Sequence, residues 1–101
     1  MKIDCKNEDN NLTICMDGEL DHHVASIVKD ELDRLILDNM PTGVVFDFKG
    51  VNFMDSTGIG VLLGRYKMLK SLNIKAYLKN PTNTIDRLLK LSGIYNVIAK
   101  I

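Results

Sequence analysis

The 101-residue sequence lacks the features that mark several classes of protein. Its 13 basic and 13 acidic side chains cancel, so there is no excess positive charge to attract nucleic acid or an anionic membrane. No run approaches the roughly 18 consecutive apolar residues of a membrane-spanning helix, and polar residues follow Met1 where a signal peptide would have an apolar core. We therefore expect a soluble, cytoplasmic protein with no nucleic-acid or membrane partner.

Cysteine and histidine are too few to build a disulfide framework or a metal site. Cys5 and Cys15 lie in separate strand-like runs without a C-x-x-C motif, which favours two reduced, packed thiols. His22 and His23 are adjacent, so on a helix they would project about 100° apart, and no third histidine completes a zinc site. We interpret both as helix-start residues and expect no metal and no cofactor.

The chain does contain a regular alternation of strand and helix patterns, with room for one core and one domain over residues 1–101. Strand patterns occupy 2–6, 11–16, 44–48, 73–79 and 97–99. The first two flank a polar turn and suggest an antiparallel pair, although a third strand inserted between them is an alternative. The order β-β-α-β-α-β-α-β predicts an α/β fold with a mostly parallel sheet and helices packed on one face.

The first helical pattern follows Gly18-Glu19-Leu20-Asp21. Asp21 is the predicted N-cap, because a short carboxylate can accept hydrogen bonds from the free N–H groups of a first turn. The apolar stripe predicted to face the core consists of Val24, Ile27, Val28, Leu32, Leu35 and Ile36.

The most informative stretch is 53–60, Phe-Met-Asp-Ser-Thr-Gly-Ile-Gly. It joins the apolar strand pattern 44–48 to a helical pattern that runs through Lys70, and so lies at the carboxyl end of a strand, where open α/β sheets place functional groups. Asp55, Ser56 and Thr57 are all residue types that cap helices.

Two interpretations of this turn remain open from the spacing alone. In the first, Ser56 or Thr57 is only a helix cap. In the second, Ser56 is an accessible site of covalent modification, and Gly58 and Gly60 keep side chains out of a partner's way.

Three segments resemble one family of regulators. Gly18-Glu19-Leu20-Asp21-His22-His23, then 53–61, then Leu63-Gly64-Arg65-Tyr66-Lys67 resemble, in order and spacing, the anti-sigma factor antagonists of the STAS domain fold, closest to the stage II sporulation AA type. The resemblance covers nearly the whole chain. Thr57 departs from it, since a serine is often found there, and the sequence stops at Ile101 where relatives commonly carry a further helix.

The resemblance implies a partner-switching protein that is not itself an enzyme. Such a protein binds an anti-sigma factor that is also a serine kinase, and thereby frees a sigma factor. The kinase phosphorylates the serine after the turn aspartate, here Ser56, and the phosphorylated form lets go; a serine phosphatase reverses the modification. Asp21 matches a family position where an acidic side chain is expected to meet basic residues of the kinase. We expect a monomer when the protein is free.

The partner is expected to contact the surface around the phosphoacceptor. The residues assigned to that contact are Asp21, Phe53, Met54, Asp55, Thr57, Gly58 and Ile59. Phe53, Met54 and Ile59 would supply its apolar part. An alternative of equal standing is that Phe53 and Met54 tuck beneath the turn into the core.

Other functions fit less well. A hydrolase is disfavoured because the serine turn is not a G-x-S-x-G elbow, and dinucleotide binding because the glycines do not form G-x-G-x-x-G. The closest rival is a STAS module from a general-stress or other partner-switching cascade, with the same switch but a different sigma factor. A more distant one is a scaffold module that binds without being phosphorylated.

Overall fold

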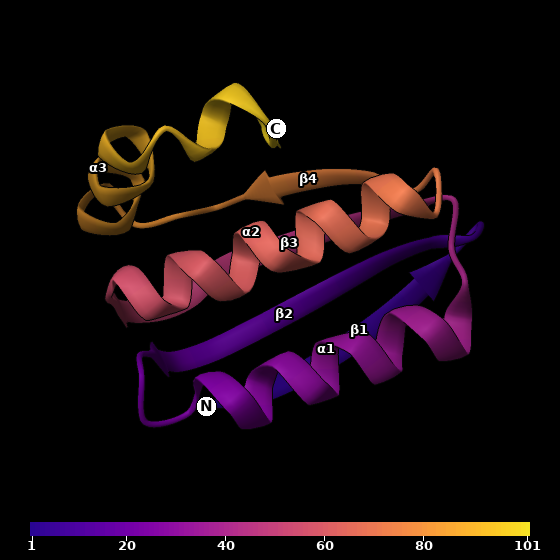
Figure 1. Cartoon of the computed structure of the whole chain (residues 1–101), viewed down its shortest axis with the longest axis horizontal. Coiled ribbons are helices and arrows are strands. Elements are labelled where there is room, and N and C mark those ends of the chain that lie inside the picture. Colours follow the sequence, from indigo (N-terminus) through magenta and orange to yellow (C-terminus); the bar gives the residue numbers. More distant parts are fainter.

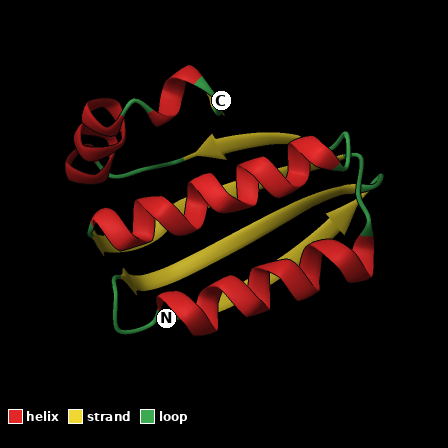
Figure 2. Cartoon of the chain, in the orientation of Figure 1, coloured by secondary structure: helices red, strands yellow, loops and turns green.

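Five strands form one sheet in the order β1-β2-β3-β4-β5; Figures 1 and 2 show β1 to β4 behind the helices. The computed structural model describes residues 1–101. The strands are β1 (Lys2–Glu8), β2 (Asn11–Leu20), β3 (Gly43–Met54), β4 (Lys75–Lys79) and β5 (Ala99–Lys100). β1 pairs antiparallel with β2 and the other pairings are parallel. The predicted mostly parallel sheet is confirmed, and no third strand separates β1 from β2.

A helix lies in each connection between parallel strands, and the helices cover one face of the sheet. They are α1 (Ala25–Asn39), α2 (Ser56–Ser71) and α3 (Asn83–Ser92), with a short 3-10 helix η1 (Ile94–Asn96) before β5. Figure 1 shows α1 and α2 side by side in front of the strands and α3 at one corner. None of these helices combines the length and the hydrophobicity needed to cross a membrane.

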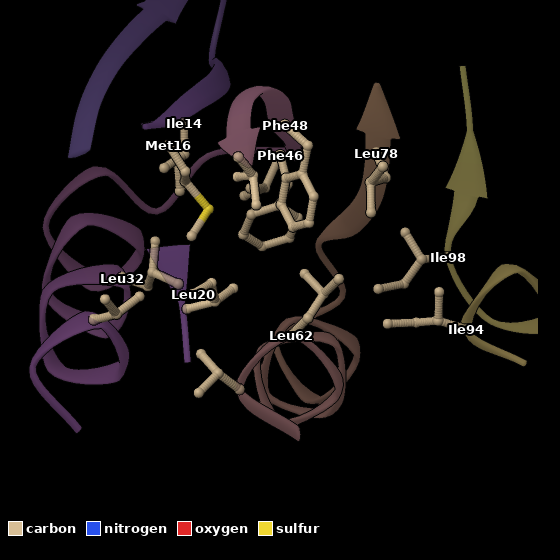
Figure 3. Packing of buried hydrophobic residues seen from close by; sticks show 14 of the residues in the cluster. Ile14, Met16, Leu20, Leu32, Phe46, Phe48, Leu62, Leu78, Ile94 and Ile98 are labelled. Atoms are coloured by element: carbon tan, nitrogen blue, oxygen red, sulfur yellow. The ribbon is translucent and has the colours of Figure 1, made fainter. Parts of the chain in front are cut away.

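The centre of the core comes from β2 and β3, because alternate residues of a strand point to the same face of the sheet. The residues of the central part of these two strands that are almost completely buried include Leu12, Ile14, Met16, Val44, Phe46 and Phe48. Figure 3 shows Ile14, Met16, Phe46 and Phe48 on the side of the sheet that faces Leu32 of α1 and Leu62 of α2. The face without helices carries the opposite alternation, including Asp47 and Lys79, which lie opposite each other on β3 and β4.

The length of the two central strands positions the functional site. β3 continues through Lys49 and Gly50, where the sequence pattern had predicted its end, because Val51 and Met54 are buried beyond them. The parallel register places Leu20 opposite Met54, despite irregularities earlier in the pair. The turns that follow β2 and β3 therefore emerge side by side.

Several local predictions need correction. Asp21 is not the N-cap of α1: the helix begins at Ala25, after Val24, and has no side-chain cap. Ile27, predicted to face the core, is 71% exposed, because the buried stripe of α1 runs through Ala25 and Val28 instead. Cys5 was predicted to be packed but is exposed on β1, an edge strand with a neighbour on one side only.

A shielded ion pair joins the two long helices. Arg65 of α2 is 6% exposed, and its Nε lies 2.8 Å from Oδ1 of Asp33 on α1. Lys29 also approaches Asp33, at 3.0 Å. Removing the carboxylate would leave the guanidinium buried without a counter-charge, which is strongly unfavourable. The pair thus restrains α2 against α1.

Candidate functional site

The candidate site lies where the turn after β2 meets the turn after β3. Asp55 holds the two turns together. Its Oδ1 accepts a hydrogen bond from the backbone N–H of Gly58 at 2.9 Å, which makes it the N-cap of α2. Its Oδ2 accepts from the backbone N–H of His22 at 3.1 Å and lies 3.2 Å from the Nδ1 of the same residue.

The charge state of Asp55 follows from these donors. The Gly58 N–H, followed by the His22 ring and the His22 N–H, lowers the pKa of the Asp55 carboxyl below its usual range. The side chain is therefore ionised at neutral pH. The negative charge at the mouth of α2 is also favoured by the helix dipole.

Ser56 and Thr57 occupy the first two positions of α2 and both are exposed. Because Asp55 supplies the capping hydrogen bond, neither hydroxyl is needed to cap the helix. The interpretation of Ser56 or Thr57 as only a helix cap is therefore wrong, because Asp55 is the cap. Ser56 is exposed and directly follows an ionised carboxylate in the sequence.

Gly58 packs inside the protein, whereas the sequence analysis predicted that it keeps the surface clear for a partner. The residue is buried, and a Cβ built on it would collide with the carbonyl oxygen of Leu20 and lie 3.1 Å from Cγ of Met54. The start of α2 can approach the end of β2 this closely only with glycine. A Cβ built on Gly60, in contrast, would meet nothing within 4 Å.

The three apolar residues predicted to face a partner differ in exposure. Phe53 is 49% exposed, whereas Met54 is 5% exposed and belongs to the core; Ile59 is partly buried. For Met54 the core alternative therefore holds, and for Phe53 it does not. A groove of about 210 Å³ adjoins Phe53 and is lined by Asn52, Phe53, Met54, Thr84, Ile85 and Leu88.

Asp21 lies in the neighbouring turn and is engaged there. Its Oδ1 accepts from the backbone N–H of His23 at 2.9 Å, its Oδ2 lies 3.6 Å from Nδ1 of His23, and its side chain is 14% exposed. The adjacent imidazole rings of His22 and His23 have centroids 4.0 Å apart. Each of the two consecutive histidines thus contacts a different aspartate.

Sequence reasoning missed the contact between His22 and Asp55. It treated both histidines as residues of the helix start, whereas they lie in the turn that precedes α1. The missing information was the register of β2 on β3, since only a strand that continues to Leu20 brings His22 to Asp55. No group of three or more His, Cys, Asp or Glu side chains is arranged to hold a metal ion.

Known proteins are similar to this chain in both sequence and fold. The chain is 31% identical over 98 residues to the anti-sigma F factor antagonist of Paenibacillus polymyxa, a match that covers 97% of this chain and 84% of that protein. It is 29% identical over 98 residues to the anti-sigma-B factor antagonist of Bacillus subtilis, covering 97% and 88%.

A solved structure and a family model extend these matches. The structure of the Bacillus cell fate determinant SpoIIAA in its phosphorylated form matches with a TM-score of 0.73 and 26% identity, over 99% of this chain and 91% of that one. The STAS domain model matches residues 2–101. This match along almost the entire sequence, on a fold shared with SpoIIAA, shows that the chain belongs to the STAS domain family.

Proposed function

We propose that the protein is an anti-sigma factor antagonist whose binding to an anti-sigma factor kinase is switched off by phosphorylation of Ser56. The observation that carries this proposal is an exposed serine at the first position of α2, relieved of capping by Asp55. The relatives named as antagonists and the relative solved in a phosphorylated form support it. The protein would act as a cytoplasmic binding protein, monomeric when free, and not as an enzyme.

The proposed phosphorylation requires no catalytic groups from this chain. A kinase brings its own nucleotide, magnesium and base, so the substrate needs only a hydroxyl in line with the γ-phosphate. The Ser56 Oγ would form a bond to the γ-phosphorus, the bond to the ADP leaving group would break, and the hydroxyl proton would pass to the base of the kinase. A serine phosphatase would restore the hydroxyl by hydrolysis.

The phosphate changes the charge of the binding surface. It adds roughly −1.5 to −2 charges at neutral pH, next to the ionised Asp55. Where the bound kinase places an acidic group against the phosphate, like charges about 4 Å apart would cost on the order of 4 kcal/mol at an effective dielectric constant of about 20. Half of that amount weakens a complex by about 30-fold, which is enough to release the partner.

The surface offered to the kinase would consist of the exposed and partly buried groups around Ser56. Phe53, Thr57 and Ile59 supply apolar and hydroxyl contacts, and Asp55 and the rim of Asp21 supply negative charge for basic residues of the kinase. Met54 and Gly58 would act indirectly, by supporting the turn from beneath.

Phosphorylation with the cognate kinase and ATP tests the assignment. A single phosphate on Ser56, found by mass spectrometry of peptides, is expected in the wild-type chain and in the control Thr57→Ala, and no phosphate in Ser56→Ala. Phosphate on Thr57 alone, or none at all, would contradict the proposal. In a pull-down, the phosphorylated chain should bind the kinase at least about 30-fold more weakly than the unmodified chain.

A general-stress cascade is the second candidate, because relatives of the sigma-B type match almost as well as those of the sigma-F type. The same site and the same switch would serve either. Measuring affinity for anti-sigma factors of both types separates the two, and binding that is insensitive to phosphate would instead indicate a scaffold module.

A further inference from the structure

We propose that the His22 imidazole is the in-chain charge partner of a phosphate on Ser56, so that phosphorylation draws a proton onto this ring. The inference rests on the proposed modification of Ser56 and concerns how the chain itself responds to it. Its starting point is geometric: His22 Nδ1 lies 3.2 Å from Oδ2 of Asp55, the residue directly before Ser56.

The contact with Asp55 fixes which ring nitrogen is free. The Asp55 carboxylate can only accept, because its pKa is lowered and it carries no proton at neutral pH. Nδ1 of His22 must therefore hold the ring hydrogen that points to it. In the neutral ring this leaves Nε2 as the nitrogen that can take up a proton, on a side chain that is 65% exposed.

Groups that favour and groups that disfavour a positive charge surround His22. Asp55 from the α2 side favours a charged ring, and Asp21 in the same turn is occupied by His23. The His23 ring, with its centroid 4.0 Å away, disfavours a second positive charge. The amino ends of α1 and α2 present the positive ends of two helix dipoles, which also disfavour it. A phosphate dianion on the residue after Asp55 would add negative charge on the Asp55 side of the ring and so favour imidazolium.

His23 provides an internal control. It has the same chemistry and is adjacent in sequence, but its Nδ1 lies 3.6 Å from Asp21 and not beside Asp55. A phosphate that acts through a general field should affect both rings alike. A phosphate paired with His22 should affect mainly that ring, and the proximity of the two rings makes protonation of one oppose protonation of the other.

The proposal has a consequence for the switch. A proton on His22 offsets one of the charges that the phosphate adds. As the pH falls through the midpoint of the His22 transition, the ring becomes charged and the phosphorylated surface should repel the kinase less. The difference in kinase affinity between the phosphorylated and unmodified chains should then shrink.

The test uses the full chain with phosphoserine incorporated at position 56 during translation, so that no kinase is required. Ring signals of His22 and His23 are followed by NMR as a function of pH in the modified and unmodified chains. We expect the midpoint of the His22 transition to rise by about 0.5 to 1 pH unit on phosphorylation, and that of His23 by less than half as much.

A second measurement follows the phosphate by ³¹P NMR. By linkage, the phosphate should lose its last proton at a higher pH in His22→Gln than in the wild type, by a similar interval, and His23→Gln should behave like the wild type. Equal shifts of the two histidines, no shift of either, or a phosphate titration unchanged in His22→Gln would overturn the proposal. None of these outcomes depends on whether a kinase modifies Ser56, so failure here is distinct from failure of the proposed function.

Discussion

Two aspartates, each at the beginning of a helix, do different work in this domain. Asp55 caps α2 through the backbone N–H of Gly58 and accepts from His22. Asp86, in the first turn of α3, accepts instead from the Tyr95 hydroxyl at 2.6 Å and from Nζ of Lys100 at 2.9 Å, and Lys90 lies 3.2 Å away.

The pKa of both carboxyls is lowered, but by different donors. The largest effect on the pKa of Asp55 is a backbone N–H, whereas on Asp86 it is the Tyr95 hydroxyl, followed by Lys100. Asp86 therefore ties side chains near the C-terminus to α3, and is surrounded by partners. Asp55 binds mainly backbone N–H groups, and the neighbouring Ser56 and Thr57 remain exposed. The start of α2 thus combines a fixed backbone with little side-chain cover, the two features that the proposed modification of Ser56 requires.

The largest expected effect concerns the packing beneath Asp55. Gly58→Ala should lower the free energy of unfolding by about 2 kcal/mol, because its Cβ would overlap the Leu20 carbonyl and overpacking outweighs the gain in helix propensity. Urea unfolding measures the loss. The matched control Gly60→Ala meets no neighbour and should be neutral or more stable by up to about 1 kcal/mol. Equal effects of the two substitutions would mean that the end of β2 does not constrain α2.

A smaller effect is expected when the two carboxylates are exchanged for alanine. Asp55→Ala should slow phosphorylation of Ser56 and reduce stability together, because the first turn of α2 loses its cap and its link to His22. Asp86→Ala should reduce stability and leave phosphorylation unchanged. Thermal unfolding and a kinase assay on both variants measure the separation. A phosphorylation defect in Asp86→Ala would break the comparison between the two regions.

The smallest effects are those of pH. The lowered pKa of each aspartate contributes stability that is complete above the ordinary carboxyl range and lost as the pH falls through it, below about 4. At the C-terminal region a second loss is expected in alkali: burial and the hydrogen bond to Asp86 raise the pKa of Tyr95, so its stabilisation is complete below about pH 10 and declines progressively as the pH rises above that value. Urea midpoints of wild type, Asp86→Asn and Tyr95→Phe between pH 3 and 11 test this. Tyr95→Phe should remove the alkaline loss and also reduce the acid loss, because the Tyr95 hydroxyl is the main donor to Asp86.

The fold could be predicted because its signals are local. Leu12, Ile14 and Met16 alternate along one strand, and the apolar residues of α2 recur at helical spacing. The fold class, the order of the elements along the chain and the single layer of helices therefore followed from the hydrophobic pattern. The end of β3 could not be predicted, since Lys49 and Gly50 resemble a turn unless the burial of Val51 is known.

The site was predictable in position and less so in detail. Asp55, Ser56 and Thr57 were placed at the start of α2 from residue type alone. The burial of Met54, the packing role of Gly58 and the contact of His22 with Asp55 all depend on which strand lies beside β3 and in what register. Such relations are tertiary, and the periodicity of a single segment carries no information about them.

Under the proposed function, the Arg65–Asp33 pair limits how a phosphate on Ser56 can act. Sliding α2 along α1 would strip a buried guanidinium of its counter-charge, so a group added at the tip of α2 has no low-cost route to an altered helix arrangement. Modified and unmodified molecules should then share one backbone. Under the proposed function, a binding partner must then tell the two forms apart by contacts of its own surface with the phosphate. Different partners could therefore differ in sequence while this domain keeps its shape.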